Sequence, residues 1–154
     1  MGRAKEKPLY DPAVDYEDDF YQWCFEQAAL LRQKRFAELD LPNIIEELES
    51  MGRSERRALT SSYRLLMFHL LKWQFQPEMR SRSWQLTIIR ERGSIEEQED
   101  RNPSLRADAQ GIVAATYPKA RKDAVIETGL GLDTFPAECP YTLAQLRAED
   151  WMPE

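Results

Sequence analysis

The apolar residues of this 154-residue chain recur at steps of three and four, the spacing of one face of an α-helix. The longest series starts after residue 40 and predicts one helix that runs to about residue 76. We expect Gly52, in its middle, to mark a close helix contact or a kink. The predicted inner face consists of Ile45, Leu48, Gly52, Glu55, Leu59, Ser62, Leu66, His69 and Trp73. Its three polar members, Glu55, Ser62 and His69, are unusual for a pure core face.

Three further helices are predicted from apolar residues at helical spacing and from residues that are typical of helix ends. The first begins after Asp15 and closes at basic residues 32–35, which suit a helix C-terminus. Pro77 is predicted to end the long helix and to open the third, which ends near residue 100. Asn102 and Pro103 then start a fourth helix that stops at Gly129. The inner faces are Phe20, Trp23, Gln27, Leu30 and Leu31 in the first helix; Trp84, Ile88 and Ile95 in the third; and Leu105, Ala109, Ile112, Thr116, Ala120 and Ala124 in the fourth.

These elements predict an all-α fold, an up-down bundle of about four main helices in one domain of residues 15–154. Residues 1–14 are polar and basic and read as a flexible tail. Residues 15–128 form the bundle, and Asp40 is the expected cap of its long helix. Residues 129–154 contain three prolines and predict an irregular C-terminal wrap with short helical turns, one of them over Leu143 and Leu146. No segment alternates apolar and polar residues as a half-buried strand does.

The charge of the chain is sectored along the sequence. Residues 1–51 carry 6 Lys and Arg against 12 Asp and Glu, residues 52–92 carry 9 against 3, and residues 93–154 carry 6 against 12. Acidic and basic helices could pair inside the fold, or the basic segment could form an exposed anion-binding face. The net charge of −6 argues against a protein that coats nucleic acid over its whole surface.

The sequence favours a cytoplasmic location and gives no sign of a membrane partner. The start of the chain has no apolar stretch of the kind that a signal peptide needs. No run approaches the roughly 20 apolar residues that span a bilayer. Cys24 and Cys139 are far apart in the sequence, and we expect both to be reduced.

The strongest candidates for anion binding are Lys72, Arg80 and Arg82, with Arg53 and Arg56 as further candidates. Arg80 and Arg82 lie near the predicted start of the third helix. Helix N-termini present free N–H groups that favour anions, and arginine adds bidentate recognition of phosphate or carboxylate. The alternative is that these side chains pair with carboxylates of neighbouring helices.

Candidates for catalysis are weaker. His69 is the only histidine, so it is the simplest general base near neutral pH, supported by Glu49 or Glu55 from a neighbouring helix or subunit. The alternative is a hydrogen-bonded core histidine. Glu55 and His69 are fourteen residues apart, about 21 Å along a straight helix, so they cannot share a metal ion within it. We therefore expect no metal site and no cofactor.

Long motifs in the chain resemble those of a known family: YEDDFYQW (16–23), AELDLPNIIEELESMGRSERRAL (37–59), HLLKWQFQPEMRSRSW (69–84), ETGL (127–130) and TFPAECPYTLAQLRAEDWMPE (134–154). The chain closely resembles the bacterial family catalogued as domain of unknown function twenty-nine. The resemblance covers about residues 10–154 and implies an all-helical fold. It implies no activity, so it assigns no catalytic residue.

Three functional hypotheses remain open at this point. The first, which we favour because no catalytic signature is present, is a non-enzymatic protein-interaction or oligomerising module that binds a second copy or a cytoplasmic protein. The second is an anion or nucleic-acid binder that uses the basic segment 52–92. The third is an enzyme with His69 as acid or base and helix carboxylates beside it.

Overall fold

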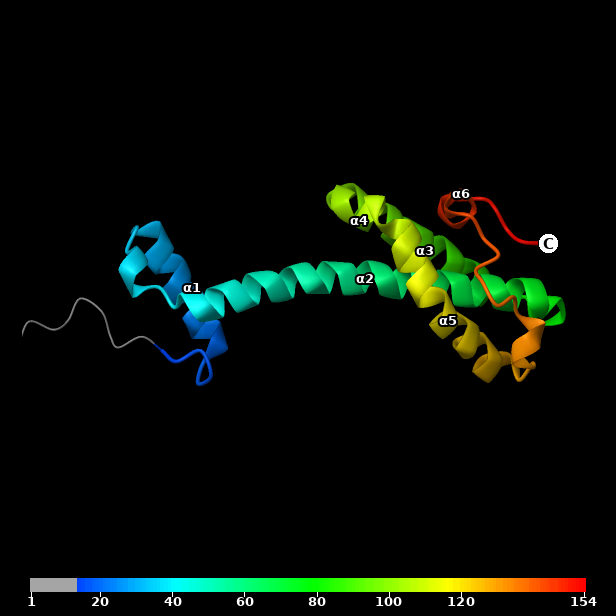
Figure 1. The fold of residues 1–154 in the computed structure, drawn as a ribbon, viewed down its shortest axis with the longest axis horizontal. Coiled ribbons are helices and arrows are strands. Elements are labelled where there is room, and N and C mark those ends of the chain that lie inside the picture. Colours follow the sequence, from blue (N-terminus) through cyan, green and yellow to red (C-terminus); the bar gives the residue numbers. More distant parts are fainter. Residues whose placement is uncertain (1–13) are drawn as a thin grey trace, which may run out of the picture. The chain divides into compact units, whose positions relative to one another are not determined.

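The computed structural model describes residues 14–154, so the predicted tail lies outside the described residues except for Val14. The described chain is helical and contains no strand, which confirms the predicted all-α class. Figure 1 shows the main helices α1 (Phe20–Arg32), α2 (Leu41–Phe75), α3 (Arg82–Arg101) and α5 (Ala109–Thr128). Short elements complete the fold: α4 (Pro103–Ala107), α6 (Leu143–Arg147) and the 3₁₀ turns Phe36–Glu38, Pro77–Met79 and Leu132–Thr134.

The chain divides into two compact units, residues 1–51 and residues 52–154. The division falls inside α2, between Met51 and Gly52. The hydrophobic core of buried residues, from Leu59 to Leu146, belongs to the second unit. That residues 15–154 form one domain stays a prediction.

In the first unit, α1 begins later than the sequence suggested. Residues 15–18 form a turn, and Asp19 is the N-cap, since its carboxylate accepts the backbone N–H of Gln22 at 3.0 Å. Trp23, Gln27 and Leu30 are buried as predicted. Phe20 and Leu31 were also expected on the inner face, and this was wrong, because both side chains are exposed. The buried face of α1 is therefore narrower than its apolar composition indicates.

The end of α1 is a Schellman motif built around a lysine. The N–H of Lys34 bonds to the carbonyl of Leu31 at 3.0 Å, and the N–H of Arg35 bonds to that of Leu30 at 2.9 Å. This reversal requires a left-handed backbone, and Lys34 adopts a φ of 58°. Glycine is the usual residue here, because a Cβ is strained in this conformation.

Asp40 joins α1 to the start of α2, as its predicted role as a cap suggested. Its carboxylate accepts hydrogen bonds from the side chains of Trp23 at 3.0 Å and Asn43 at 2.8 Å. The Asn43 side chain, and with smaller effects the Trp23 indole and the Asn43 backbone N–H, hold the pKa of Asp40 below its usual value. The backbone N–H of Asp40 donates to Gln27 at 2.8 Å. These bonds fix the turn between the two helices.

The stripe predicted for α2 is buried over only part of its length. Leu59, Ser62 and Leu66 are buried, whereas Ile45 and Leu48 are exposed, which corrects the expectation of a continuous inner face. Gly52 lies inside an uninterrupted helix. A Cβ built on it meets no described atom within 4 Å, so the expected close helix contact is absent from the described chain.

The second unit packs α3, α5 and the C-terminal segment against the later half of α2 (Figure 1). The third helix begins at Arg82, capped by Ser81, and Pro77 opens a separate 3₁₀ turn instead. The fourth predicted helix is also divided, because the chain leaves helical geometry at Asp108 between α4 and α5. Its apolar stripe is nevertheless confirmed: every member from Ala109 to Ala124 is buried.

Two end signals had different outcomes. Gly129 has a φ of +71° and ends α5 as predicted. Asn102 makes no capping bond with its side chain, which instead donates to Glu55 at 3.0 Å and to the carbonyl of Gln98 at 2.9 Å. The side chain thus links α3 to α2.

The C-terminal wrap contains the predicted turn over Leu143 and Leu146, observed as α6. A capping box opens this helix, since Thr142 and Gln145 bond to each other's backbone N–H. Phe135, Tyr141 and Leu146 are buried in the core, and Leu143 and Trp151 pack against it. The wrap is therefore part of the hydrophobic core of the second unit.

We predict that Lys34→Gly raises the free energy of unfolding by about 1 kcal/mol, because it removes the strain of a Cβ at positive φ. Gln33→Gly is the matched control. Gln33 has a right-handed φ of −83°, so glycine there should lower stability by about 0.5 kcal/mol. Urea unfolding followed by circular dichroism measures both. Equal effects at the two positions would contradict the prediction.

Candidate functional site

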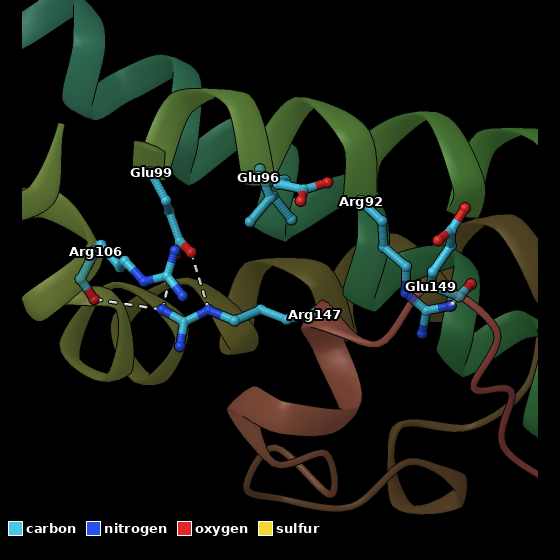
Figure 2. Close-up of a pocket in the computed structure, with 7 residues that line it drawn as sticks. Arg92, Glu96, Glu99, Arg106, Arg147 and Glu149 are labelled. Carbon is cyan, nitrogen blue, oxygen red and sulfur yellow. Dashed lines mark hydrogen bonds and ion pairs between the residues drawn. The ribbon is translucent and has the colours of Figure 1, made fainter. Parts of the chain in front are cut away.

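The second unit contains a cavity of about 330 Å³ lined mainly by charged side chains. Figure 2 shows how the side chains converge on it from α3, α4, α6 and the residues after α6. The lining residues are Arg92, Ile95, Glu96, Glu99, Arg106, Arg147 and Glu149. Three arginines therefore face three glutamates.

A buried carboxylate lies at one end of the cavity. Glu99 is 1% exposed and accepts two hydrogen bonds from Arg147, at 2.9 and 3.0 Å. The hydroxyl of Tyr63 in α2 donates to the same carboxylate at 2.6 Å. Burial, with a further effect of this bond, raises the pKa of Tyr63 above its usual range. We call this set the Glu99 clasp (Tyr63, Glu99 and Arg147), and it ties α2, α3 and α6 together.

Arg92 lies at the other end of the cavity and holds the end of α6. Its guanidinium donates to the backbone carbonyls of Leu146 at 3.0 Å, Gln145 at 3.1 Å and Glu149 at 3.2 Å. Carbonyls at a helix C-terminus lack partners within the helix and carry partial negative charge. The buried guanidinium of Arg92 therefore supplies hydrogen-bond donors to these carbonyls, and their partial negative charge offsets its positive charge.

The charged side chains that line this cavity serve mainly to hold the fold together. Arg147 and Arg92 are engaged by the chain itself, and Arg106 pairs with Asp100 at 3.3 Å. Equal numbers of arginine and glutamate leave no net charge to attract an anion. The lining holds the C-terminal segment in place.

The structure places the predicted anion-binding lysine inside the fold. Lys72 is 3% exposed, and its ammonium lies 4.4 Å from the centre of the Phe68 ring and 4.5 Å from that of Trp84. Glu127 of α5 lies 3.8 Å away. Burial lowers the pKa of Lys72, against the opposing effect of Glu127. Aromatic faces and a carboxylate thus compensate the charge of this lysine.

The basic part of α2 pairs with acidic residues near and within α5. Arg56 bonds to Asp108 at 2.7 Å, and Arg64 bonds to Asp123 at 2.6 Å. Together with the pair of Lys72 and Glu127, these contacts match the alternative in which basic and acidic helices pair inside the fold.

The remaining basic candidates, Arg53, Arg80 and Arg82, are exposed, unlike Lys72. Arg80 donates from Nε to the carbonyl of Trp73 at 2.8 Å, and its guanidinium lies 5.0 Å from the centre of the Trp73 ring. Arg82 is the first residue of α3, whereas Arg80 precedes the helix. Arg53 is exposed on α2. Anion binding by these residues stays a prediction.

The catalytic candidates do not share one cavity among those described. His69 is half-buried, and its Nδ1 lies 2.9 Å from the carbonyl of Leu65, so the neutral ring carries its proton there. Glu55 pairs with Arg101 at 2.6 Å and with Asn102. Glu49 is exposed and lies in the first unit. Catalysis by this set stays a prediction.

The feature that sequence reasoning missed is an apolar surface on the first unit. Nine of the fifteen large apolar side chains exposed in the described chain lie between Phe20 and Met51. Tyr21 and Phe25 are 75% and 62% exposed on α1, and their rings lie 5.0 Å apart. On α2, Leu41, Ile45 and Leu48 follow at steps of four and three, and all three are exposed. We call these three residues the exposed stripe.

Another face of this part of α2 is contacted by a residue of its own unit. The hydroxyl of Tyr16 donates to Glu47, and this bond raises the pKa of Tyr16 to about 12. Glu47 lies about 100° from Leu48 around the helix axis, so Tyr16 contacts a different face from the exposed stripe. The sequence signal was present, because Leu41, Ile45 and Leu48 are apolar at helical spacing. The same spacing also fits a core face, and a core face is what the sequence analysis predicted.

The family described as Domain of unknown function DUF29 matches residues 16–152. The chain belongs to this family. The match confirms the resemblance drawn from the sequence motifs. The DUF29 chain has no significant match among curated proteins and none among solved structures.

The described part of this DUF29 protein contains neither a cluster of metal-binding side chains nor a helix suited to span a membrane. Within residues 14–154, no group of three or more His, Cys, Asp or Glu side chains could hold a metal ion. No helix in the same range is long and apolar enough to cross a membrane.

We predict that Glu99→Gln lowers the free energy of unfolding by about 2 kcal/mol, because it breaks a buried pair and leaves Arg147 without its carboxylate. The cost stays below that of a fully buried pair, since Arg147 is partly exposed. Glu96→Gln is the matched control, as Glu96 lines the same cavity on the same helix but is exposed. Urea unfolding measures both. Equal losses would show that Glu99 has no special role.

A second prediction concerns pH. Burial lowers the pKa of His69, with Lys72 acting in the same direction, while the Leu65 carbonyl, Glu91 and Glu127 oppose the shift. The unfolded chain, with a histidine pKa of about 6.5, therefore takes up a proton before the folded chain does. Stability contributed by neutral His69 is present above that pH and is lost as the pH falls towards the folded pKa.

The free energy of unfolding of the wild type should accordingly fall more than that of His69→Gln between about pH 7 and about pH 5. Urea unfolding at a series of pH values measures the difference, in which other titrating groups cancel. Parallel profiles for the two proteins would contradict the assignment.

Proposed function

We propose that this DUF29 protein is a non-enzymatic protein-interaction module that docks a basic amphipathic helix on the exposed stripe of α2. The observation that carries the proposal is the exposure of Leu41, Ile45 and Leu48, at 51%, 52% and 63%. Apolar residues at this spacing form one helix face. Contiguous apolar surface of this kind is typical of interaction sites, and a helix laid along it is a common mode of recognition.

Charge supports the choice of a basic partner. Residues 14–51 contain ten Asp and Glu against three Lys and Arg. Glu46, Glu47 and Glu49 lie on α2 between or beside the members of the exposed stripe. A partner helix with lysine or arginine flanking its apolar face would meet opposite charge on either side. An acidic partner would be repelled.

The two alternatives receive less support from the same structure. The anion or nucleic-acid site keeps only part of its predicted residues, because Lys72 is buried and Arg56 pairs with Asp108, whereas Arg80 and Arg82 are exposed. An enzyme would need His69 beside a carboxylate in a cleft, and His69 lines none of the cavities described. We therefore place function on the first unit.

The proposed location is the cytoplasm. Cys24 and Cys139 are both free thiols, as is usual in a reducing compartment. The partner helix would accordingly belong to a protein of the same compartment.

A binding experiment tests the proposal. The probe is a fluorescent amphipathic Leu/Lys helix of about 18 residues, added to the full chain at low concentration. We expect Ile45→Ala/Leu48→Ala to weaken binding at least about tenfold, a loss of about 1.4 kcal/mol, because it removes apolar contact area. Fluorescence anisotropy gives the dissociation constants.

The matched control is Ile126→Ala. Ile126 is 82% exposed but lies on α5 in the second unit, so its truncation should leave the affinity unchanged. Absence of binding by the wild type, or equal binding by all three proteins, would overturn the proposed function.

A further inference from the structure

A second cavity, of about 460 Å³, lies between α5 and the C-terminal wrap within the second unit. Its lining includes Gln110, Ala114 and Pro118 of α5 and Ala137 and Glu138 of the wrap. We call it the Pro118 cavity. We propose that it binds a primary ammonium group on an alkyl chain, as in a small amine or a lysine side chain. The inference concerns a separate site and does not rest on the proposed function.

The wall of the cavity opposite α5 is held in place by hydrogen bonds to that helix. The hydroxyl of Tyr117 donates to the carbonyl of Pro136 at 2.7 Å. The guanidinium of Arg121 donates twice to the carbonyl of Phe135, at 2.8 and 3.1 Å. On the other side, Cys139 packs against the hydrophobic core. The two residues between these anchors are therefore fixed beside α5, and the cavity is preformed.

Pro118 leaves one backbone acceptor of α5 without its usual partner. Proline has no N–H, so the helical bond from residue 118 to the carbonyl of Ala114 cannot form. The helix nevertheless continues past Pro118 to Thr128. A helical carbonyl points along the axis towards the residue four positions on, so this oxygen lies between Ala114 and Pro118. Both residues are exposed and line the cavity.

Two side chains of the lining add further acceptors. Glu138 supplies a carboxylate and Gln110 an amide oxygen, and neither side chain makes a hydrogen bond or ion pair within the described chain. The described lining contains no lysine or arginine, so the carboxylate is its only formal charge. The Pro118 cavity therefore favours a cation, unlike the cavity beside Glu99, where arginines and glutamates balance.

An alkylammonium group matches this set of atoms. It has three N–H donors, and the carbonyl of Ala114, the amide of Gln110 and the carboxylate of Glu138 supply three acceptors. A guanidinium matches less well, because it is planar and prefers two parallel bonds to one carboxylate. Ala137 and the ring of Pro118 offer apolar contact to the alkyl chain. Small-molecule sites have volumes of roughly 300–1,000 Å³, and this cavity lies within that range.

The first test is an NMR titration of the full chain with n-butylammonium chloride at constant ionic strength. We expect saturable shifts of the backbone amides that line the cavity. Glu138→Gln should weaken binding at least about fivefold, because it removes the charged acceptor. The matched control is Asp133→Asn, which removes the same charge from an exposed side chain of the wrap outside the lining. Its affinity should equal that of the wild type.

Pro118→Ala tests the role of the backbone carbonyl. It restores an N–H that can bond to the oxygen of Ala114, so we expect binding to weaken at least about threefold. The midpoint of thermal unfolding should rise, because the helix gains a hydrogen bond. An unchanged affinity, or an unchanged midpoint, would overturn the inference.

Three probes identify the chemistry of the ligand. Nα-acetyl-lysine amide represents the side chain of a peptide, and n-butylammonium represents a free amine, so the tighter of the two gives the source of the ammonium group. Tetramethylammonium has the same charge but no N–H, and it should bind at least about tenfold more weakly. Equal binding of tetramethylammonium, or the absence of saturable shifts with both amines, would overturn the proposal.

Discussion

In the second unit, the carboxylate of Glu99 is the point where three elements meet. Tyr63 reaches it from α2 and Arg147 from α6, so one buried group fixes the C-terminal segment against two long helices. A buried carboxylate is costly unless donors surround it, and here a hydroxyl and a guanidinium supply them. Arg92 completes the attachment by holding the carbonyls at the end of α6. The wrap is thereby held by charge as well as by its apolar side chains.

This arrangement accounts for the buried part of α2. The elements held by the Glu99 clasp pack over the helix from Leu59 onwards, and they cover the later half of its predicted inner face. In the first unit, Trp23, Gln27 and Asp40 bond at the very start of α2, and Tyr16 contacts Glu47. None of these contacts involves the exposed stripe. Leu41, Ile45 and Leu48 are exposed in the first unit.

The sequence predicted the helices and most of the core because periodicity reports which residues share a face. It predicted the stripe of α5 for that reason, and the cap at Asp40 because aspartate is a preferred residue before a helix. It could not tell that Ile45 and Leu48 are exposed while Leu59 and Leu66 are buried, since the spacing is identical and cover depends on distant elements. The break at Asp108 was also missed, because the apolar series continues across it from Leu105 to Ala109 at helical spacing. For the candidate site residues, the sequence identified which side chains could bind an anion or act as a base, but it could not tell which of them are exposed.

The charges of α2 extend the same reasoning to the partner. Within the second unit, Arg56, Arg64 and Lys72 meet Asp108, Asp123 and Glu127, so much of the basic segment is neutralised by the acidic segment that follows it. Aromatic rings further shield Lys72. The first unit has ten acidic and three basic residues in its described part and therefore keeps an excess of negative charge beside its apolar stripe. An apolar stripe flanked by carboxylates favours a basic helix over an acidic partner.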